Sequence, residues 1–171
     1  MEQGQIINAS RDQLNRVLAF FPRVDAKMSV VLAVDTGMLA FLAAKIPSLT
    51  SLLPWEIAVA LLPVALICGS LWHLYKGAFP SLEGGALSLI YFREIAKRTE
   101  AKFIDEFIKQ SEEEYLKDML GQVWRNSEIL KEKFDHLKYA FILLALAILP
   151  WVVALIIFSS KGAMLNSVAL S

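Results

Sequence analysis

The residues best suited to binding a small ligand lie in a short polar stretch around Trp124. Its indole offers an aromatic face on which a base can stack, and Arg125 and Asn126 offer hydrogen-bond donors for phosphate oxygens and base edges. A second cluster, Arg23-Val-Asp25-Ala-Lys27, precedes a long apolar stretch. Basic residues in such a place bind lipid headgroups or helix ends equally well, so both interpretations stay open. With Arg93 and Gln122 added, the candidate ligand-binding residues are Arg23, Asp25, Lys27, Arg93, Gln122, Trp124, Arg125, Asn126 and Lys133.

Asp35 stands out because it lies within an almost uncharged stretch, followed by the polar Thr36. An ionised carboxylate is costly in an apolar medium and usually has a function there. One interpretation is a polar contact between subunits or along an aqueous path, and the other is a protonated structural residue. The small residues on either side of Asp35 would let helices approach closely, and they are Ala33, Gly37 and Ala40.

No catalytic constellation is visible. The chain has no phosphate-binding Walker loop, no GxSxG nucleophile turn and no HExxH zinc motif. His73 and His136 have no partner at metal-ligand spacing, and the single Cys excludes a multi-cysteine metal site. The 17 basic and 17 acidic residues balance, which argues against coating a nucleic acid. We therefore expect no enzyme activity, no metal and no cofactor.

Three nearly uncharged stretches must position these residues. Each is close to the roughly 20 residues that a helix needs to cross a bilayer, and in lipid only a helix satisfies its own backbone. The sequence predicts an all-α membrane protein, with three transmembrane helices and a cytoplasmic helical segment between the second and third. The alternative is a set of core helices in a soluble all-α protein. The stretches are Met28–Ile46, Trp55–Tyr75 and Leu137–Phe158.

The positions of Lys and Arg predict the orientation. Four lie before the first stretch and ten lie between the second and third, whereas the short loop Pro47–Pro54 has none. By the positive-inside rule, the N-terminus and the middle segment face the cytoplasm. The expected organisation is a cytoplasmic amphipathic segment (1–27), a transmembrane hairpin (28–75), a cytoplasmic helical sensor segment (76–136), a third transmembrane helix (137–158) and a periplasmic tail (159–171).

Helix signals refine this picture. Ser10 with Gln13, and Ser111 with Glu114, both match a capping box at a helix start, and a helix is expected over Leu87–Lys109. Pro22 is expected to interrupt the first helix before the membrane. No Pro or linker separates Glu112 from Leu137, so the last cytoplasmic helix is predicted to run into the third span as one rod.

The chain also resembles a known family. The resemblance rests on PRVDAKMSVVLAVDTGMLAFL at the first span, SLIYFREIAKRT in the middle segment and YLKDMLGQVWRNSEILKEKFDHLKYAF leading into the last span. It covers roughly Gln13 to Leu155, and these blocks are similar to the membrane-spanning effectors of Pycsar, the bacterial anti-phage signalling systems that use cyclic pyrimidine nucleotides.

The resemblance implies a function. A companion cyclase makes 3′,5′-cyclic CMP or 3′,5′-cyclic UMP on infection, and the effector senses it and impairs the bacterial inner membrane, so that growth stops or the cell dies. No strand-patterned segment separates the spans, so the helical segment would bind the nucleotide. The small cytoplasmic part suggests a homo-oligomer. Two alternatives stay open: a scaffold that recruits a partner, and a small channel in which Asp35 is an ion or proton site.

Overall fold

The computed structural model describes residues 3–47, 52–79 and 85–169, with side chains described up to residue 162. Its helices are α1 (Gln3–Leu18), α2 (Phe21–Lys45), α3 (Pro54–Ala78), α4 (Phe92–Ile95), α5 (Glu100–Lys109) and α6 (Glu112–Ala169). The chain is 87% helical, with no strand in these described ranges. Three helices are long and apolar enough to cross a membrane, which confirms the predicted all-α class. The loop expected at 47–54, the turn at 77–86 and the end of the tail fall partly outside the described residues.

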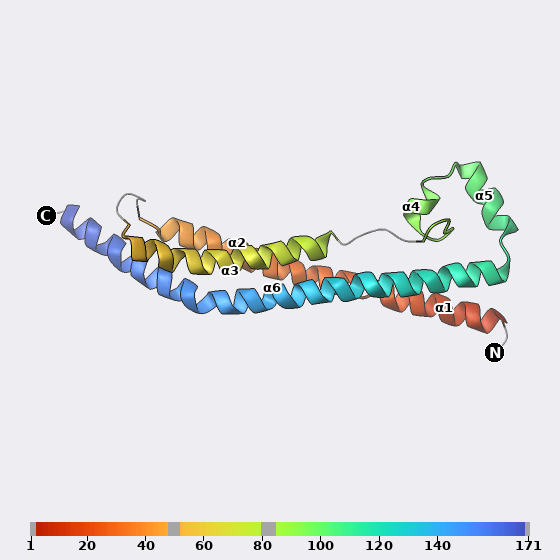
Figure 1. Ribbon diagram of the computed structural model, residues 1–171, viewed down its shortest axis with the longest axis horizontal. Helices are drawn as coiled ribbons and strands as arrows, with labels where there is room; N and C mark the ends of the chain where they lie inside the picture. Colours follow the sequence, from red (N-terminus) through yellow and green to blue (C-terminus); the bar gives the residue numbers. More distant parts are fainter. Residues whose placement is uncertain (1–2, 48–51, 80–84, 170–171) are drawn as a thin grey trace. The chain divides into compact units, whose positions relative to one another are not determined.

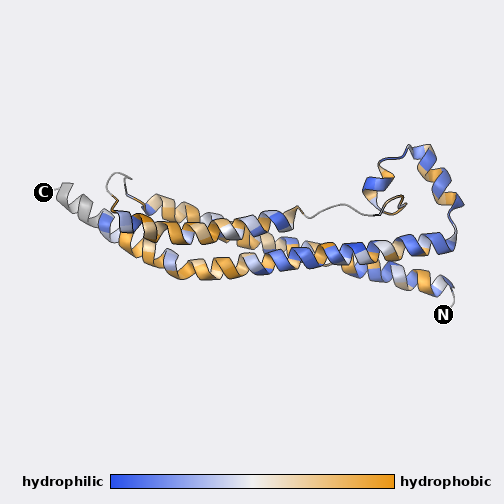
Figure 2. Ribbon diagram, viewed as in Figure 1, coloured by the Kyte–Doolittle hydropathy of each residue, from blue (hydrophilic) through white to orange (hydrophobic). Residues whose placement is uncertain are grey.

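The chain divides into two compact units. One, called here the polar unit, comprises Met1–Val24 and Pro80–Lys133, and the other, called the span unit, comprises Asp25–Phe79 and Phe134–Ser171. Figure 2 shows that the apolar residues gather on α2, α3 and the C-terminal part of α6, whereas the N-terminal part of α6 is hydrophilic. Helix α6 contributes residues to both units. The side of the membrane that each unit faces stays a prediction.

The span unit is a bundle of three helices, in which α2, α3 and the C-terminal part of α6 lie side by side (Figure 1). Buried positions recur at alternating steps of three and four residues, the heptad spacing of coiled coils. This spacing keeps one seam of each helix facing the other two, with close packing where Gly77 meets Met28 and His136. The buried seams are Met28, Val31, Asp35, Met38 and Leu42 of α2; Pro63, Ile67, Ser70, Leu74 and Gly77 of α3; and Leu137, Ala140, Leu144 and Ala147 of α6.

Helix α6 is continuous, as the absence of Pro or a linker between Glu112 and Leu137 predicted. It begins at Glu112 and extends to Ala169, beyond Phe158, where the third span is expected to end; the end of the span stays a prediction. Both intramembrane prolines lie inside unbroken helices, Pro63 in α3 and Pro150 in α6. A membrane helix tolerates proline because neighbouring groups satisfy the freed backbone.

The predicted capping box at Ser10 is wrong. Ser10 lies in the interior of α1 and its hydroxyl donates to the Ile6 carbonyl at 2.9 Å, so it caps nothing. The break between α1 and α2 falls at residues 19–20, before Pro22, which sits in the first turn of α2. Proline is favoured there because its missing N–H is unpaired in any helix start.

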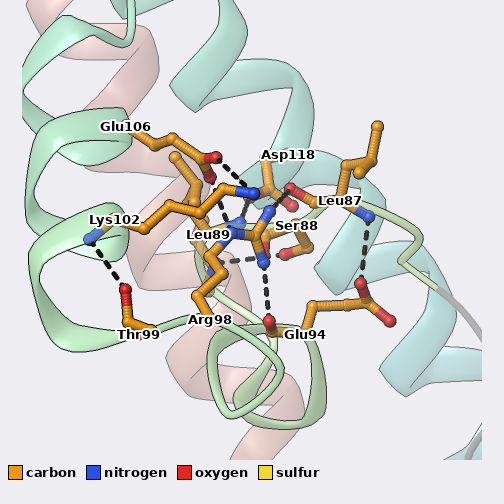
Figure 3. A network of polar contacts seen from close by, with 10 residues as sticks. Leu87, Ser88, Leu89, Glu94, Arg98, Thr99, Lys102, Glu106 and Asp118 are labelled. Carbon is orange, nitrogen blue, oxygen red and sulfur yellow. Dashed lines mark hydrogen bonds and ion pairs between the residues drawn. The ribbon is translucent and has the colours of Figure 1, made fainter.

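The predicted helix over Leu87–Lys109 is also wrong, because a compact turn and the short helix α4 precede α5. Gly85 and Leu87 both have positive φ, and a Cβ on Gly85 would lie 2.9 Å from the Gln122 side-chain nitrogen. The Leu87 backbone is held on both sides, by Glu94 on its N–H and by Arg98 on its carbonyl (Figure 3). These bonds stabilise a backbone conformation that a leucine otherwise avoids.

The predicted capping box at Ser111 is confirmed. The Glu114 N–H donates to the Ser111 hydroxyl oxygen at 3.2 Å, and the Ser111 N–H donates to the Glu114 carboxylate at 2.9 Å. The Ser111 N–H, and then its hydroxyl, lower the pKa of Glu114 below its ordinary value. The contribution of Glu114 to stability is therefore present above the ordinary glutamate pKa, and is lost as the pH falls through the lowered pKa.

Arg98 joins α4, α5 and the turn, which generates a stability prediction. Its guanidinium contacts the Glu106 carboxylate at 2.6 Å and donates to the backbone carbonyls of Glu94 and Leu87. We expect Arg98→Ala to lower the free energy of unfolding by about 2 kcal/mol, because charge-assisted bonds are lost together. The matched control is Arg93→Ala, an exposed arginine in α4, which should unfold like the parent protein in denaturant. Equal stability of the two variants would show that the contacts of Arg98 do not stabilise this part of the fold.

Candidate functional site

The buried centre of the span unit is polar. Asp35 of α2, Ser70 of α3 and Ala140 of α6 are all fully buried at the same level of the bundle. The Ser70 hydroxyl oxygen lies 2.6 Å from Asp35 Oδ2 and 3.0 Å from the Ala140 carbonyl oxygen. One serine therefore joins all three helices. This arrangement does not favour the interpretation of Asp35 as a contact between subunits, because its partner belongs to the same chain.

The number of hydrogens available to these contacts indicates the protonation state of Asp35. A serine hydroxyl has one hydrogen, so it cannot donate to Asp35 and Ala140 at once. Both contacts are hydrogen bonds when Asp35 Oδ2 carries a hydrogen and donates it to Ser70 Oγ, which then donates to Ala140. Asp35 Oδ1 is buried with no hydrogen-bond partner, a costly arrangement for an ionised carboxylate. The geometry favours a protonated structural aspartate. Thr36 is exposed and its hydroxyl donates to the Leu32 carbonyl within its own helix.

A histidine pair lies about one turn from this centre in the span unit. The Nδ1 atoms of His73 and His136 are 3.1 Å apart, and the His73 ring also packs against Tyr139. The sequence, in which neither histidine has a partner at metal-ligand spacing, did not reveal this contact. One imidazole must donate and the other accept, so the contact requires at least one of them to be neutral. No group of three or more His, Cys, Asp or Glu that could hold a metal ion occurs in the part of the chain that the structure describes.

Other polar contacts join the span helices further along. The Trp151 indole N–H donates to the Met38 carbonyl at 2.9 Å, and Lys161 pairs with the buried carboxylate of Glu56 at 2.5 Å. Each contact lets a polar group in an apolar bundle bind another protein group instead of water.

In the polar unit, part of the predicted ligand site serves the fold. Gln122 is buried and its amide donates to the Ser88 hydroxyl, while the Asn126 amide donates to the Gln122 carbonyl. Lys133 is buried, with its ammonium 5.9 Å from the centroid of the Phe21 ring. These three side chains share one face of α6 at heptad spacing, and that face is packed.

Trp124 lies on a different face of α6 and is 65% exposed. Arg125 is half-buried and pairs with Glu128 at 3.1 Å, although its Nε is buried without a hydrogen-bond partner. In the described part of the chain, Trp124 therefore does not share a face of α6 with Gln122, Asn126 and Lys133. A base on Trp124 with its phosphate near basic groups stays a prediction.

The remaining predicted residues are exposed and scattered. In the polar unit, the Arg23 guanidinium lies 5.2 Å from the centroid of the Phe20 ring, and Arg93 extends from α4. Asp25 is the first residue of the span unit, and Lys27 lines an apolar groove between α2 and α6 in the same unit.

The polar unit contains instead a cavity that sequence reasoning missed. Its volume is about 320 Å³, and Arg11 of α1 faces residues from the end of α5 and the start of α6 across it. Phe107 and Tyr115 give it an aromatic wall, with ring centroids 6.2 Å apart at an interplanar angle of 80°. The rest of its lining is polar, from Gln110, Ser111 and Glu112. A cation, aromatic faces and an amide converge here.

One comparison with known proteins found a match. A family model described as the Pycsar effector protein domain matches residues 9–159 of the chain. No curated protein and no solved structure matches the chain.

The contact between Asp35 and Ser70 generates a second prediction. Ser70→Ala should lower the free energy of unfolding in detergent by about 1 kcal/mol, because Asp35 then lacks its hydrogen-bond partner on α3. Asp35→Asn should retain most of the stability, since its amide can donate to Ser70. Ser29→Ala is the control, because its hydroxyl is exposed and donates only within α2. Ser70→Ala behaving like Ser29→Ala in a melting experiment would show that the contact is absent.

Proposed function

Because the chain belongs to the Pycsar effector family and has a role in Pycsar anti-phage defence, we propose that it binds a cyclic pyrimidine nucleotide and then impairs the membrane. The polar unit would bind the nucleotide, and the span unit of this multi-pass membrane protein would act on the bilayer. We propose that the protein lies in the bacterial inner membrane, with the polar unit in the cytoplasm and the end of the chain in the periplasm. The proposal includes no catalytic step and no cofactor.

The observation that carries the nucleotide proposal is the cavity beside Arg11. Arg11 is exposed and has no ion-pair partner among the described residues, so its guanidinium is available for the cyclic phosphate. The start of α6 is a poor phosphate site by itself, because Glu114 already caps it and Glu112 and Glu113 lie beside it. The phosphate therefore belongs at Arg11.

The other lining groups match the rest of such a ligand. A base can stack on Tyr115 or Phe107, and the Gln110 amide can both donate to and accept from the edge of a pyrimidine. The Glu112 carboxylate can accept from the ribose 2′-hydroxyl, the one free ribose hydroxyl in a 3′,5′-cyclic nucleotide. Since an amide suits either pyrimidine, both cyclic CMP and cyclic UMP fit this lining.

A ligand activates the protein only if it binds one arrangement better than another. Helix α6 supplies Glu112 and Tyr115 to the cavity, and Ala140 to the contact with Ser70. A nucleotide that favours a shifted α6 would therefore oppose the packing of Ala140 against Ser70. Release of Ser70 and Asp35 would expose polar groups to lipid, which favours rearrangement of the spans.

We also propose a homo-oligomer. Thr36 and Gly37 are exposed on α2, and a Cβ on Gly37 would meet nothing within 4 Å in the described chain. Ala33 and Ala40 are exposed there too, so this face would admit a helix of a second subunit closely.

A second candidate function is a small oligomeric channel. The observation that favours it is a polar series in the span unit, because Ser70 contacts Asp35 at one level and His73 contacts His136 about one turn away. Ion flux that follows an ion gradient without any nucleotide would favour the channel over the nucleotide-gated effector.

The cavity generates a third prediction. Cyclic CMP or cyclic UMP should raise the melting temperature of the purified full-length protein, because a ligand of the native state stabilises it. Arg11→Gln and Tyr115→Ala should each weaken the apparent affinity at least tenfold, since a charge-assisted bond or a stacking face is lost. Nucleotide-dependent dye leakage from liposomes that hold the protein should weaken in parallel.

Arg16→Gln is the matched control, an exposed arginine of the same helix that does not line the cavity. It should respond to nucleotide like the parent protein. A response that survives Arg11→Gln and Tyr115→Ala but disappears in Trp124→Ala would place the site on the exposed face of α6 instead.

A further inference from the structure

An open groove runs between α2 and α6 on the outer side of the span unit. Its volume is about 640 Å³ and its walls are almost entirely apolar, with Val30 and Val31 on α2 and Phe141 and Ile142 on α6. Two lysines also line it, Lys27 of α2 and Lys138 of α6. The combination of an apolar groove and two cations differs from the nucleotide cavity, which is mostly polar.

On each helix, a lysine precedes apolar residues that line the groove. The contacts of α2 with α6 advance together, from Asp35 near Ala140, through Met38 on Trp151, to Leu42 against Phe158, so the two helices run in the same direction. Lys27 precedes Val30 and Val31 in α2, whereas Lys138 follows Phe134 and Leu137 and precedes Phe141 and Ile142 in α6. Because the helices are parallel, the apolar walls continue beyond both lysines toward the middle of the bundle.

Neither lysine is neutralised within the described chain. Both side chains are exposed, and neither Lys27 nor Lys138 has an ion pair with a residue that the structure describes. Other lysines of the chain do have carboxylate partners, among them Lys109 and Lys161. Two unpaired cations beside an apolar surface attract an anion that has an apolar body.

We propose that the groove binds an anionic phospholipid. The phosphate would lie between the ammonium groups of Lys27 and Lys138, and one acyl chain would lie along Val31, Phe141 and Ile142. Lysine is a common phosphate ligand, and long side chains at helix ends extend toward the headgroup region. A nucleotide does not suit this groove, because the apolar walls leave its base and ribose without hydrogen bonds.

The same charges argue against a second copy of the chain in this groove. An apolar helix seated there would cover the walls but would leave two ammonium groups without a counter-charge. A phospholipid supplies both the acyl chain and the negative charge. The lipid would bridge α2 and α6, so the packing of these spans would depend on the headgroup composition of the membrane.

The test uses purified full-length protein, stripped of lipid in detergent, and native mass spectrometry with phosphatidylglycerol or phosphatidylcholine of identical acyl chains. The parent protein should prefer phosphatidylglycerol. In the double variant Lys27→Gln/Lys138→Gln the preference should fall by about thirtyfold, the combined contribution of two lysines at a membrane surface. Lys76→Gln is the matched control, a lysine at the corresponding end of α3 that does not line the groove, and should keep the preference.

A second variant tests the apolar part of the groove separately. Val30 is 64% exposed, so Val30→Trp should fill the groove without disturbing the buried seam, and should weaken binding of both lipids. Equal binding of the two lipids by the parent protein would overturn the proposal, since lipid would then be held without regard to its headgroup. A preference for phosphatidylglycerol that survives in the double variant would overturn it as well. Disulfide-linked dimers formed through Ile142→Cys, with loss of bound lipid, would also overturn it, because a second copy of the chain would then occupy the groove.

Discussion

The hydrogen bond between Asp35 and Ser70 is the interaction on which the packing of the span unit depends. A bilayer offers no water to a buried carboxyl, so Asp35 must find a protein partner. It does so in a register that places Ser70 beside both Asp35 and Ala140. Leucine and alanine at heptad positions could pack in several registers one heptad apart, whereas a single polar residue at such a position fixes one. This contact therefore gives the bundle one defined arrangement.

Much of the fold could be predicted because it depends on local rules. The three spans follow from length and hydropathy, and the continuity of α6 follows from the absence of a helix breaker between Glu112 and Leu137. The capping box at Ser111 was recognisable because both partners lie within one helical turn. The same rule failed at Ser10, since a serine inside a helix can bond back to its own backbone, and spacing alone does not distinguish the two cases.

The candidate sites were predicted less well because they depend on contacts between distant segments. His73 and His136 are 63 residues apart, so no sequence spacing reveals that their rings meet. The cavity combines Arg11 with residues near Tyr115, and only the packing of the polar unit brings them together. Trp124 was a candidate ligand-binding residue because of its aromatic side chain. Heptad spacing counted along α6 from Gln122 would have placed Trp124 outside the buried face. The same heptad spacing predicts which polar residues of α6 pack in the fold.

The most direct test of this account is the protonation state of Asp35 in a lipid bilayer. Infrared difference spectra between the parent protein and Asp35→Asn, recorded at neutral pH without nucleotide, isolate the absorption of this one carboxyl. The account predicts a carbonyl band of a protonated carboxylic acid, which shifts in Ser70→Ala because the hydrogen bond across the helices is lost. An ionised carboxylate band that is insensitive to Ser70→Ala would contradict it, and with it the water-free packing of the three spans.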